Sequence, residues 1–519
     1  MVRLRFAPSP TGYLHVGGLR TALFCWFYVR QQGGKLIFRL EDTDQKRLVE
    51  GAENGLIGML EWAGIDLDES PRSGGESGPY RQSERLEIYN QYVRKLLEED
   101  NAYRCFCSLE RLEKLKYEQR AKGETPRYDG FCRYLPWEEV RRRTDSGEAH
   151  VVRVKIPEIP ETMVLNDLIR GSVSIETSKT EDQIIIKSDG FPTYHLAVVV
   201  DDHLMKITHV VRGEEWLPSF PKHLLLYRYF GWDPPQFAHL PLILNPDRSK
   251  LSKRQGDVAV EDFRDQGYIP EVLVNFIALL GWSPAQDQEM FTLSELVEEF
   301  SFERVNKSGA VFNREKLDWM NQQYIQNLER EDLLQRLSPF LAKTPYAGED
   351  VTLLRKAVKI LQPRLVTLVE IGERLSLFFD DNPAERLLVR TALPTVAVLE
   401  PPDDPSGLAR ALTSCGFFET VSISEEDRRR ADMYTAETKR RSARTKTKTL
   451  SEFLQSLEMR LTFDAIIDTR FAQLINKTNQ FNLTLIRHTN SELQDMLAAG
   501  HIMLGASLVD RFGDQGRIL

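Results

Sequence analysis

Hydrophobic and polar positions near the N-terminus alternate in short blocks that predict strands and helices in turn. "VRLRFAP" (residues 2–8) predicts a short buried strand, and "HVGGLRTALFCWFYVRQQGG" (15–34) predicts a helix closed by a glycine pair. A second strand, "KLIFRLEDTD" (35–44), and a second amphipathic helix, "GAENGLIGMLEWAGI" (51–65), follow. This order, with short links, predicts an α/β fold with a parallel sheet and helical crossovers.

The pattern changes at about residue 81 and returns at about residue 189. Between them, charged helical runs such as "SERLEIYNQYVRKLLEED" are mixed with alternating runs such as "AHVVRVKIP" and "GSVSIET". We interpret this segment as an inserted α+β domain. From about 258 to 371 the spacing is helical, and from about 378 it predicts an α/β tail in which a basic stretch, "KRRSARTKTKT", is solvated.

Composition and charge narrow the class of protein. The 519 residues suffice for three or four domains, and a net charge of −9 argues against a chain that binds nucleic acid over its whole surface, although a local basic face could hold RNA. We find no apolar stretch of membrane-spanning length and no secretory or transit segment at the start. Five cysteines in a chain of this length predict no disulfide framework. We therefore expect a protein of the cytoplasm, or of an organellar matrix.

The opening stretch places His15, Gly17 and Gly18 at the start of the first predicted helix. Helix N-termini attract phosphate, glycines let a ligand approach the backbone, and a histidine can donate to a phosphate oxygen. A structural turn explains the same residues equally well.

A second polar segment, "NPDRSKLSKRQGD" (245–257), carries Lys250 and Lys253 on either side of Ser252. Two lysines around a hydroxyl suit a clamp that stabilises a leaving pyrophosphate. A solvated basic turn is the alternative for such a loop on its own.

Together the two segments resemble the paired signatures of class I aminoacyl-tRNA synthetases, "HVGG" for the first and "KLSKR" for the second. "FAPSPTGYLHVGG", "RLEDTD", "GPYRQSER", "SDGFPTYHLAVVVDDH" and "GEEW" resemble, in order, the glutamyl-tRNA synthetases of bacteria and organelles, over residues 1 to about 379. The resemblance implies a Rossmann-type catalytic domain in two halves (1–80 and 189–245), an inserted domain that binds the tRNA acceptor end (81–188), a stem-contact helical domain with the KLSKR loop (246–320) and a helical anticodon-binding domain (321–378).

The resemblance also implies a reaction: glutamate and ATP give glutamyl-adenylate and pyrophosphate, and the glutamyl group passes to the 3′ end of tRNA(Glu). Arg5, Tyr194 and Arg212 match positions that bind the side-chain carboxylate, and Ser9 and Glu41 match positions that hold the amino group. The charges suit these roles, because a guanidinium pairs with a carboxylate and a carboxylate with an ammonium.

The remaining implied roles concern ATP and tRNA. ATP, accompanied by Mg²⁺, would contact His15, Gly17, Gly18, Glu215, Lys250, Ser252 and Lys253, of which His15, Lys250 and Lys253 are the candidate catalytic residues. Arg364 matches a position that contacts the last anticodon base; a plain surface arginine is the alternative. We expect a monomer without a membrane association. Val198 stands where many family members carry an asparagine of the amino acid pocket, so glutamate affinity is expected to differ.

Three cysteines of the inserted segment have the spacing C-x-C-x24-C: Cys105, Cys107 and Cys132. Some family members bind structural zinc here through cysteines and a histidine or tyrosine, which makes Tyr128 and Tyr134 candidate fourth ligands. Three thiolates without a histidine are a less usual zinc set, and three buried free cysteines are the alternative.

From about residue 379 the chain resembles the end of haloacid-dehalogenase-like proteins that load glyceryl units, through "DDNPAER", "INKTNQFNLT" and "LVDRFGD". Asp380 and Asp381 would match late metal-binding acids, but the early nucleophile motif of that fold is absent. Two other functions stay open: a glutamyl transferase that modifies a tRNA base without reading the anticodon, and a non-catalytic tRNA-binding fusion protein. The helical region 321–371 argues against the first, and the phosphate-binding residues argue against the second.

Overall fold

The computed structural model describes residues 1–251, 258–344, 347, 351–372, 377–379, 386–387, 390–391, 397–400, 456–464, 505–510 and 513–517. The chain divides into two compact units, Met1–Pro401 and Pro402–Leu519. Within the described residues, no helix combines the length and the apolar character that a membrane span requires.

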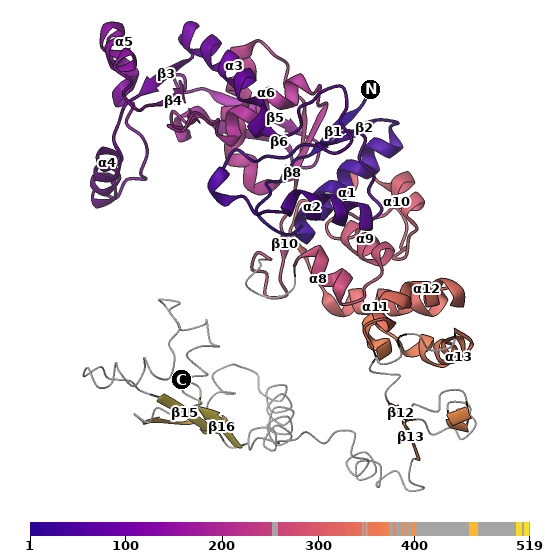
Figure 1. Cartoon of the computed structure of the whole chain (residues 1–519). Coiled ribbons are helices and arrows are strands. Elements are labelled where there is room, and N and C mark those ends of the chain that lie inside the picture. The colour runs from indigo at the N-terminus through magenta and orange to yellow at the C-terminus, as the bar shows by residue number, and fades with distance from the viewer. Residues whose placement is uncertain are drawn as a thin grey trace. The chain divides into compact units, whose positions relative to one another are not determined.

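A six-stranded sheet of order β2-β1-β8-β9-β5-β6 forms the centre of the first unit (Figure 1). Its strands are β1 (Arg3–Phe6), β2 (Lys35–Phe38), β5 (Thr162–Asp167), β6 (Gly171–Glu176), β8 (His209–Gly213) and β9 (Gln236–Leu240). All neighbouring pairs are parallel except β5 and β6. The predicted parallel sheet with helical crossovers is confirmed.

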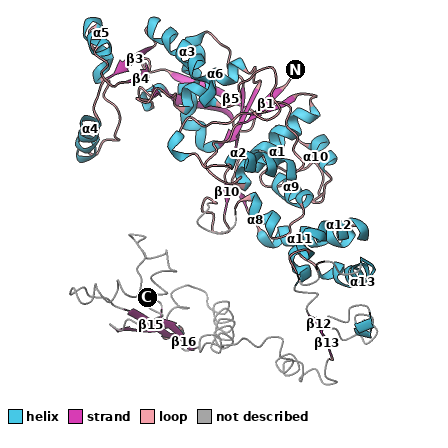
Figure 2. Cartoon of the chain, viewed as in Figure 1, coloured by secondary structure: helices cyan, strands magenta, loops and turns pink. Residues whose placement is uncertain are grey.

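Helices cover the sheet in two layers (Figure 2). Alternate residues of a strand pack against one layer or the other. Successive side chains on a strand point to opposite faces; on β2, Leu36 and Phe38 belong to one buried cluster and Ile37 to the other. The first cluster contains residues of α1 (Val16–Gln31) and α2 (Ala52–Trp62), and the second contains residues of α3 (Leu86–Glu98), α6 (Tyr194–Leu204) and α7 (Phe220–Phe230). Burial on both faces explains why all four residues of β1, "RLRF", are buried, with its two arginines paired to the acids Glu69 and Asp202.

The segment expected to form an inserted domain contributes to two sheets. Strands β3 (Ala102–Cys105), β4 (Val151–Val154) and β7 (Ile184–Ile186) form a separate antiparallel sheet, accompanied by α4 (Leu109–Ala121), a short 3-10 turn η3 (Phe131–Tyr134) and α5 (Trp137–Asp145). Strands β5 and β6 lie in the same stretch of sequence, yet they extend the central sheet, where Asp167 pairs with Phe237. The insertion is therefore continuous with the central sheet.

Helices dominate the chain after the central sheet, as predicted. They are α8 (Val260–Asp265), α9 (Pro270–Ala278), α10 (Leu293–Glu299), α11 (Arg314–Asn327), α12 (Arg330–Leu341) and α13 (Val351–Leu361), with one small parallel pair, β10 (Ile243–Leu244) and β11 (Ala310–Val311). Gly267 joins α8 to α9 at φ +79°, and a Cβ there would lie 2.5 Å from the Val369 backbone nitrogen. Only glycine allows the chain to turn so close to the start of the last 3-10 turn of this region, Leu368–Glu370.

The predicted α/β tail is described only in part. Within the first unit, β12 (Leu377–Phe379) pairs in parallel with β13 (Ala397–Leu399). The second unit contains β14 (Arg460–Asp464), β15 (Gly505–Asp510) and β16 (Gly513–Arg517) in an antiparallel sheet. Asp380, Asp381 and "INKTNQFNLT" lie outside the described residues, so the resemblance of the tail to haloacid-dehalogenase-like proteins stays a prediction.

Candidate active site

His15 caps the N-terminus of α1, where the opening motif places it. Its backbone is extended, and its Nδ1 accepts the Gly17 N–H at 3.0 Å. Because Nδ1 is the acceptor, the ring proton is on Nε2, which is a donor. A Cβ on Gly17 would lie 3.3 Å from the same Nδ1, so glycine keeps the cap uncrowded. The cap thus combines an imidazole donor with the positive end of a long helix.

A cavity of about 490 Å³ opens beside this cap, at the carboxyl ends of β1, β2 and β8. Ligands of open parallel sheets bind at this edge. All five residues predicted to bind glutamate line the cavity, together with five of the seven predicted to contact ATP: Arg5, Ser9, Glu41, Tyr194, Arg212, His15, Gly17, Gly18, Glu215 and Lys250. Ser252 and Lys253, the other two, lie outside the described residues.

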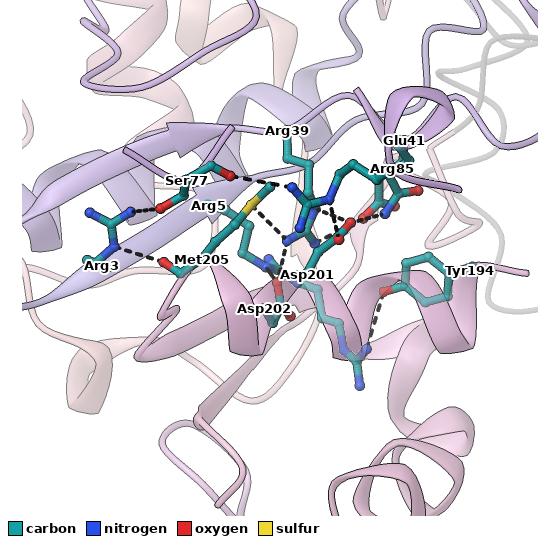
Figure 3. A network of polar contacts seen from close by, with 12 residues as sticks. Arg3, Arg5, Arg39, Glu41, Ser77, Arg85, Tyr194, Asp201, Asp202 and Met205 are labelled. Carbon is teal, nitrogen blue, oxygen red and sulfur yellow. Dashed lines mark hydrogen bonds and ion pairs between the residues drawn. The ribbon is translucent and has the colours of Figure 1, made fainter. Parts of the chain in front are cut away.

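Arg5 is held in place by a buried ion-pair network (Figure 3). Oδ1 of Asp202, on α6, accepts from Arg5 Nε at 2.9 Å and from Arg39 Nη1 at 2.7 Å. Burial alone would raise the pKa of Asp202, but the guanidinium groups of Arg5 and Arg39 lower it below its ordinary value. The carboxylate is therefore charged, and it orients the cation at the cavity wall.

Glu41 lies on the other side of Arg39, whose Nη2 is 3.2 Å from Glu41 Oε1 (Figure 3). Burial raises the pKa of Glu41 to about 7, although Arg39 and Arg5 oppose the shift. A carboxylate whose ionisation is disfavoured by burial is stabilised by a ligand ammonium. This suits the predicted role of Glu41.

A further shell of the network comes from residues that the sequence did not single out. Asp201 is fully buried and accepts from Arg85 Nε at 2.7 Å, from the Tyr89 hydroxyl at 2.8 Å and from Gln82 Nε2 at 2.9 Å. "GPYRQSER" supplies two of these partners, so its match to the family has a structural reason. The motif is connected to the cavity residues through the buried acids. The sequence alone does not show this connection.

Arg212, at the end of β8, forms the opposite wall with Tyr194, the first residue of α6. The Arg212 side chain is buried, and its Nη1 donates to the Tyr194 hydroxyl at 3.3 Å. Nη2 is buried and has no hydrogen-bond partner among the described residues. A buried guanidinium nitrogen of this kind is costly unless a ligand acceptor reaches it, which suits a carboxylate.

The predicted phosphate side of the cavity contains Glu215 and Lys250. Lys250 Nζ lies 3.8 Å from Glu215 Oε1, and both side chains are partly exposed. Gly213 precedes them, and a Cβ there would lie 2.1 Å from Glu215 Oε2. Glycine thus leaves room for the Glu215 carboxylate to fold back toward the strand end.

Arg20 is a cavity residue that sequence reasoning missed. It lies on α1, is 4% exposed, and its guanidinium donates to the backbone oxygens of Leu280, at 3.0 Å, and Pro241. Burial lowers its pKa to about 10, so it is cationic at neutral pH. The sequence indicates this residue only by its place in "HVGGLR", two residues after the glycine pair that begins the helix.

Val198 lies in the interior. It is 2% exposed, belongs to the second buried cluster on α6, and is absent from the residues that line the cavity. The expectation of altered glutamate affinity stays a prediction.

The three cysteines of the insertion meet, with their sulfur atoms all within 4.8 Å of one another. Cys107 and Cys132 are 3.5 Å apart, and the Tyr128 hydroxyl lies 3.3 Å from Cys105 Sγ and 3.6 Å from Cys107 Sγ. The Tyr134 side chain is 71% exposed, and its hydroxyl donates to Glu158. Of the two candidate tyrosines, the structure therefore brings Tyr128 to the sulfur atoms.

Arg364 ends a 3-10 turn (Gln362–Arg364) that follows α13, and it is exposed. The preceding Gln362 is buried and donates to the backbone oxygens of Ile325 and Leu328, each within 3.0 Å. The turn is thus anchored to α11 while Arg364 faces solvent.

Comparisons with known proteins agree with this geometry. Residues 1–319 match the family described as tRNA synthetases class I (E and Q), catalytic domain. The chain is 51% identical over 390 residues to a glutamate–tRNA ligase of Alkaliphilus metalliredigens (strain QYMF). The matched region covers 73% of this chain and 79% of that protein. It is 55% identical over 351 residues to that of Chloroherpeton thalassium (strain ATCC 35110 / GB-78), with coverage of 66% and 69%.

Solved structures give the same result. A glutamate tRNA ligase from Elizabethkingia meningosepticum CCUG26117, in complex with its amino acid, is 39% identical with a TM-score of 0.68 and covers 75% of this chain and 85% of that chain. The glutamate-tRNA synthetase of Elizabethkingia anophelis is 37% identical with a TM-score of 0.68, covering 81% and 91%. By its catalytic sheet, its cavity and these relatives, the chain belongs to the glutamate–tRNA ligase family of class I aminoacyl-tRNA synthetases.

Proposed function

We propose that the protein activates L-glutamate with ATP and transfers it to the 3′ end of tRNA(Glu). The observation that supports the proposal is one cavity that contains two buried arginines, a glutamate whose side chain is 9% exposed, and a helix N-terminus capped by a histidine. The arginines suit the side-chain carboxylate, Glu41 suits the ammonium, and the helix end suits phosphates.

In the first step, an α-carboxylate oxygen of glutamate attacks the α-phosphorus of ATP. The new P–O bond replaces the bond to the β-phosphate oxygen, and pyrophosphate leaves. No protein nucleophile takes part, so the protein contributes positioning and charge. His15 and Lys250 border the phosphate side, where the charge of the leaving group grows. In the second step a hydroxyl of the terminal tRNA ribose attacks the carbonyl carbon and gives up its proton, and AMP leaves with the bonding electrons.

Mg²⁺ is expected with ATP, where it neutralises part of the phosphate charge. We also propose a structural zinc ion at Cys105, Cys107, Cys132 and Tyr128. A tetrahedral ion with Zn–S bonds of about 2.3 Å needs ligand atoms separated by about 3.8 Å, and the cysteine and tyrosine atoms already cluster at similar spacing. Zinc there would tie the end of β3 to the η3 turn.

The decisive experiment is aminoacylation of total tRNA with labelled glutamate, followed by identification of the charged tRNA. Digestion with a ribonuclease that cuts after cytidine should release the label as glutamyl-adenosine. A label that stays on an internal nucleotide would instead indicate modification of a tRNA base. Folded protein that charges no tRNA would exclude the proposed function.

The described helices α11, α12 and α13 favour the ligase over the transferase that lacks anticodon reading. We expect the transferases that lack anticodon reading to end before this region.

A further inference from the structure

The Arg212 guanidinium rests against the ring nitrogens of two buried histidines. Its Nε donates to His239 Nε2 at 3.0 Å, and its Nη1 lies 3.1 Å from His223 Nδ1 as well as 3.3 Å from the Tyr194 hydroxyl. A guanidinium has five N–H bonds. These contacts use three of them, and the two on Nη2 have no acceptor among the described residues.

Each of the two histidines has a partner behind it. His239 Nδ1 lies 2.6 Å from Asp167 Oδ2, and both side chains are fully buried. His223 Nε2 lies 3.1 Å from His195 Nδ1. Since a guanidinium can only donate, both histidines must accept from Arg212. His239 then carries its proton on Nδ1 and donates it to Asp167, while His223 carries its proton on Nε2 and donates it to His195.

The surroundings keep the acceptors neutral. Burial lowers the pKa of His223 well below its ordinary value, and the charge of Arg212 lowers it further. Burial also lowers the pKa of His239, although its bond to Asp167 opposes the shift. An imidazolium at either position would place donor against donor beside a cation, so these histidines accept hydrogen bonds across the neutral range.

We propose that His239 and His223, oriented by Asp167 and His195, are positioning residues that hold Arg212 so that only its Nη2 donors remain for the substrate carboxylate. The inference rests on the proposed function, because it takes Arg212 as the partner of the glutamate side chain. Asp167 comes from β5 and His239 from β9, so the positioning depends on the junction between the insertion and the central sheet.

The arrangement has a consequence for substrate choice. Tyr194 accepts from Arg212 Nη1, so its own O–H proton is left to donate. The two Nη2 bonds are donors as well. A carboxylate, which only accepts, satisfies all of them, whereas the N–H bonds of a carboxamide would meet further donors. The histidines thus help to select a side-chain carboxylate without contacting it.

The test uses the full chain and a pair of substitutions at one position. His239→Leu removes the acceptor, and His239→Gln offers a carbonyl oxygen in its place. We expect His239→Leu to raise the KM for glutamate at least tenfold in tRNA charging while the KM for ATP changes less than twofold. His239→Gln should stay within threefold of wild type for both. His223→Leu and His223→Gln repeat the comparison if the first pair folds poorly.

His209→Leu is the matched control, because His209 is a buried histidine on the same strand as Arg212 that contacts Thr208 and Tyr28. It should leave both KM values unchanged. The proposal is overturned if folded His239→Leu keeps the wild-type KM for glutamate, or if His239→Gln loses as much as His239→Leu, which would indicate packing alone. A wild-type protein that charges no tRNA with glutamate would instead refute the proposed function.

Discussion

At the scale of single residues, the charge of Glu41 is the quantity most open to experiment. Its carboxyl is buried beside Arg39, and burial raises its pKa to about 7. An acid with a raised pKa loses its negative charge as the pH falls through that value. The residue that is proposed to hold the substrate ammonium therefore changes charge within the range where enzymes are assayed.

We predict that the KM for glutamate rises about tenfold between pH 8 and pH 6, because the ionised fraction of a group with a pKa of about 7 falls about tenfold over this range. The KM for ATP should change little. Glu41→Gln should raise the KM for glutamate at pH 8 and remove its pH dependence. Steady-state charging from pH 6 to 8 measures both; a pH dependence that survives in Glu41→Gln would assign it to another group.

A second residue-scale prediction concerns Lys253, whose position rests on the sequence. Lys253→Ala should cut the rate of adenylate formation at least about tenfold, or ~1.4 kcal/mol of transition-state stabilisation, because a cation facing the leaving pyrophosphate is lost. Glutamate binding should be unaffected. Pyrophosphate exchange in the presence of tRNA gives the rate, with the exposed Lys307→Ala as control. An unchanged rate would argue against the clamp.

At the scale of elements, the link between β3 and the η3 turn rests on the cysteine cluster. Hydrogen bonding with Cys132 lowers the pKa of Cys105, and the hydroxyl of Tyr128 contributes. Cys25, by contrast, is a lone buried thiol on α1 whose pKa burial raises to about 12. The two environments differ enough to serve as test and control.

Purified protein made with zinc supplied should contain close to one zinc ion per chain by mass spectrometric metal analysis. Cys107→Ser should lose the metal, because the site has few ligands to spare. Tyr128→Phe should bind it more weakly, and Cys25→Ser should retain it in full. Wild-type protein without zinc would refute the site.

The turn after α13 carries the second prediction at this scale. If Arg364 reads an anticodon base, Arg364→Ala should lower the preference for tRNA(Glu) over tRNA(Gln) about tenfold, since a specific base contact is worth ~1–3 kcal/mol. Lys359 is exposed on α13, and Lys359→Ala should instead lower kcat/KM for both tRNAs about equally, as expected for the loss of a phosphate contact. The ratio of kcat/KM for the two tRNAs measures the effect, and an unchanged ratio for Arg364→Ala would leave Arg364 a surface residue.

The helices and strands also show which structural features the sequence can predict. The helix that begins after His15 and the strands at 3–6 and 35–38 were predicted from apolar spacing and from capping residues. The pairing of β5 with β9 was not, because an alternating pattern shows that a strand forms but not which neighbour it joins. The contact of His239 with Asp167 depends on that pairing, and the contact of Arg212 with His239 depends on the pairing of β8 with β9, so the sequence pattern predicted neither.

At the scale of the whole molecule, the tail is the part whose contribution needs a test. The sequence predicts that the tail starts near residue 379, whereas β12 pairs with β13 inside the unit that ends at Pro401. A truncation after Pro401 keeps that pair. Deletion of residues 402–519 should leave kcat/KM for tRNA(Glu) unchanged within about threefold, or ~0.65 kcal/mol, because the proteins that the tail is predicted to resemble are not tRNA binders.

The measurement compares kcat/KM of the full chain and the truncated protein, after circular dichroism has shown that both are folded. A loss of a hundredfold or more in folded truncated protein would mean that the tail takes part in tRNA recognition.

Strand β5 limits which segments of this enzyme can be exchanged for those of another synthetase. An exchange of residues 81–188 for the corresponding stretch of another synthetase would remove two strands of the central sheet. It would also remove Asp167, the carboxylate behind His239. The insertion is thus not an exchangeable cassette: a chimaera made to alter the choice of acceptor stem would have to retain residues 162–176, or its new tRNA preference would come with a damaged amino acid pocket.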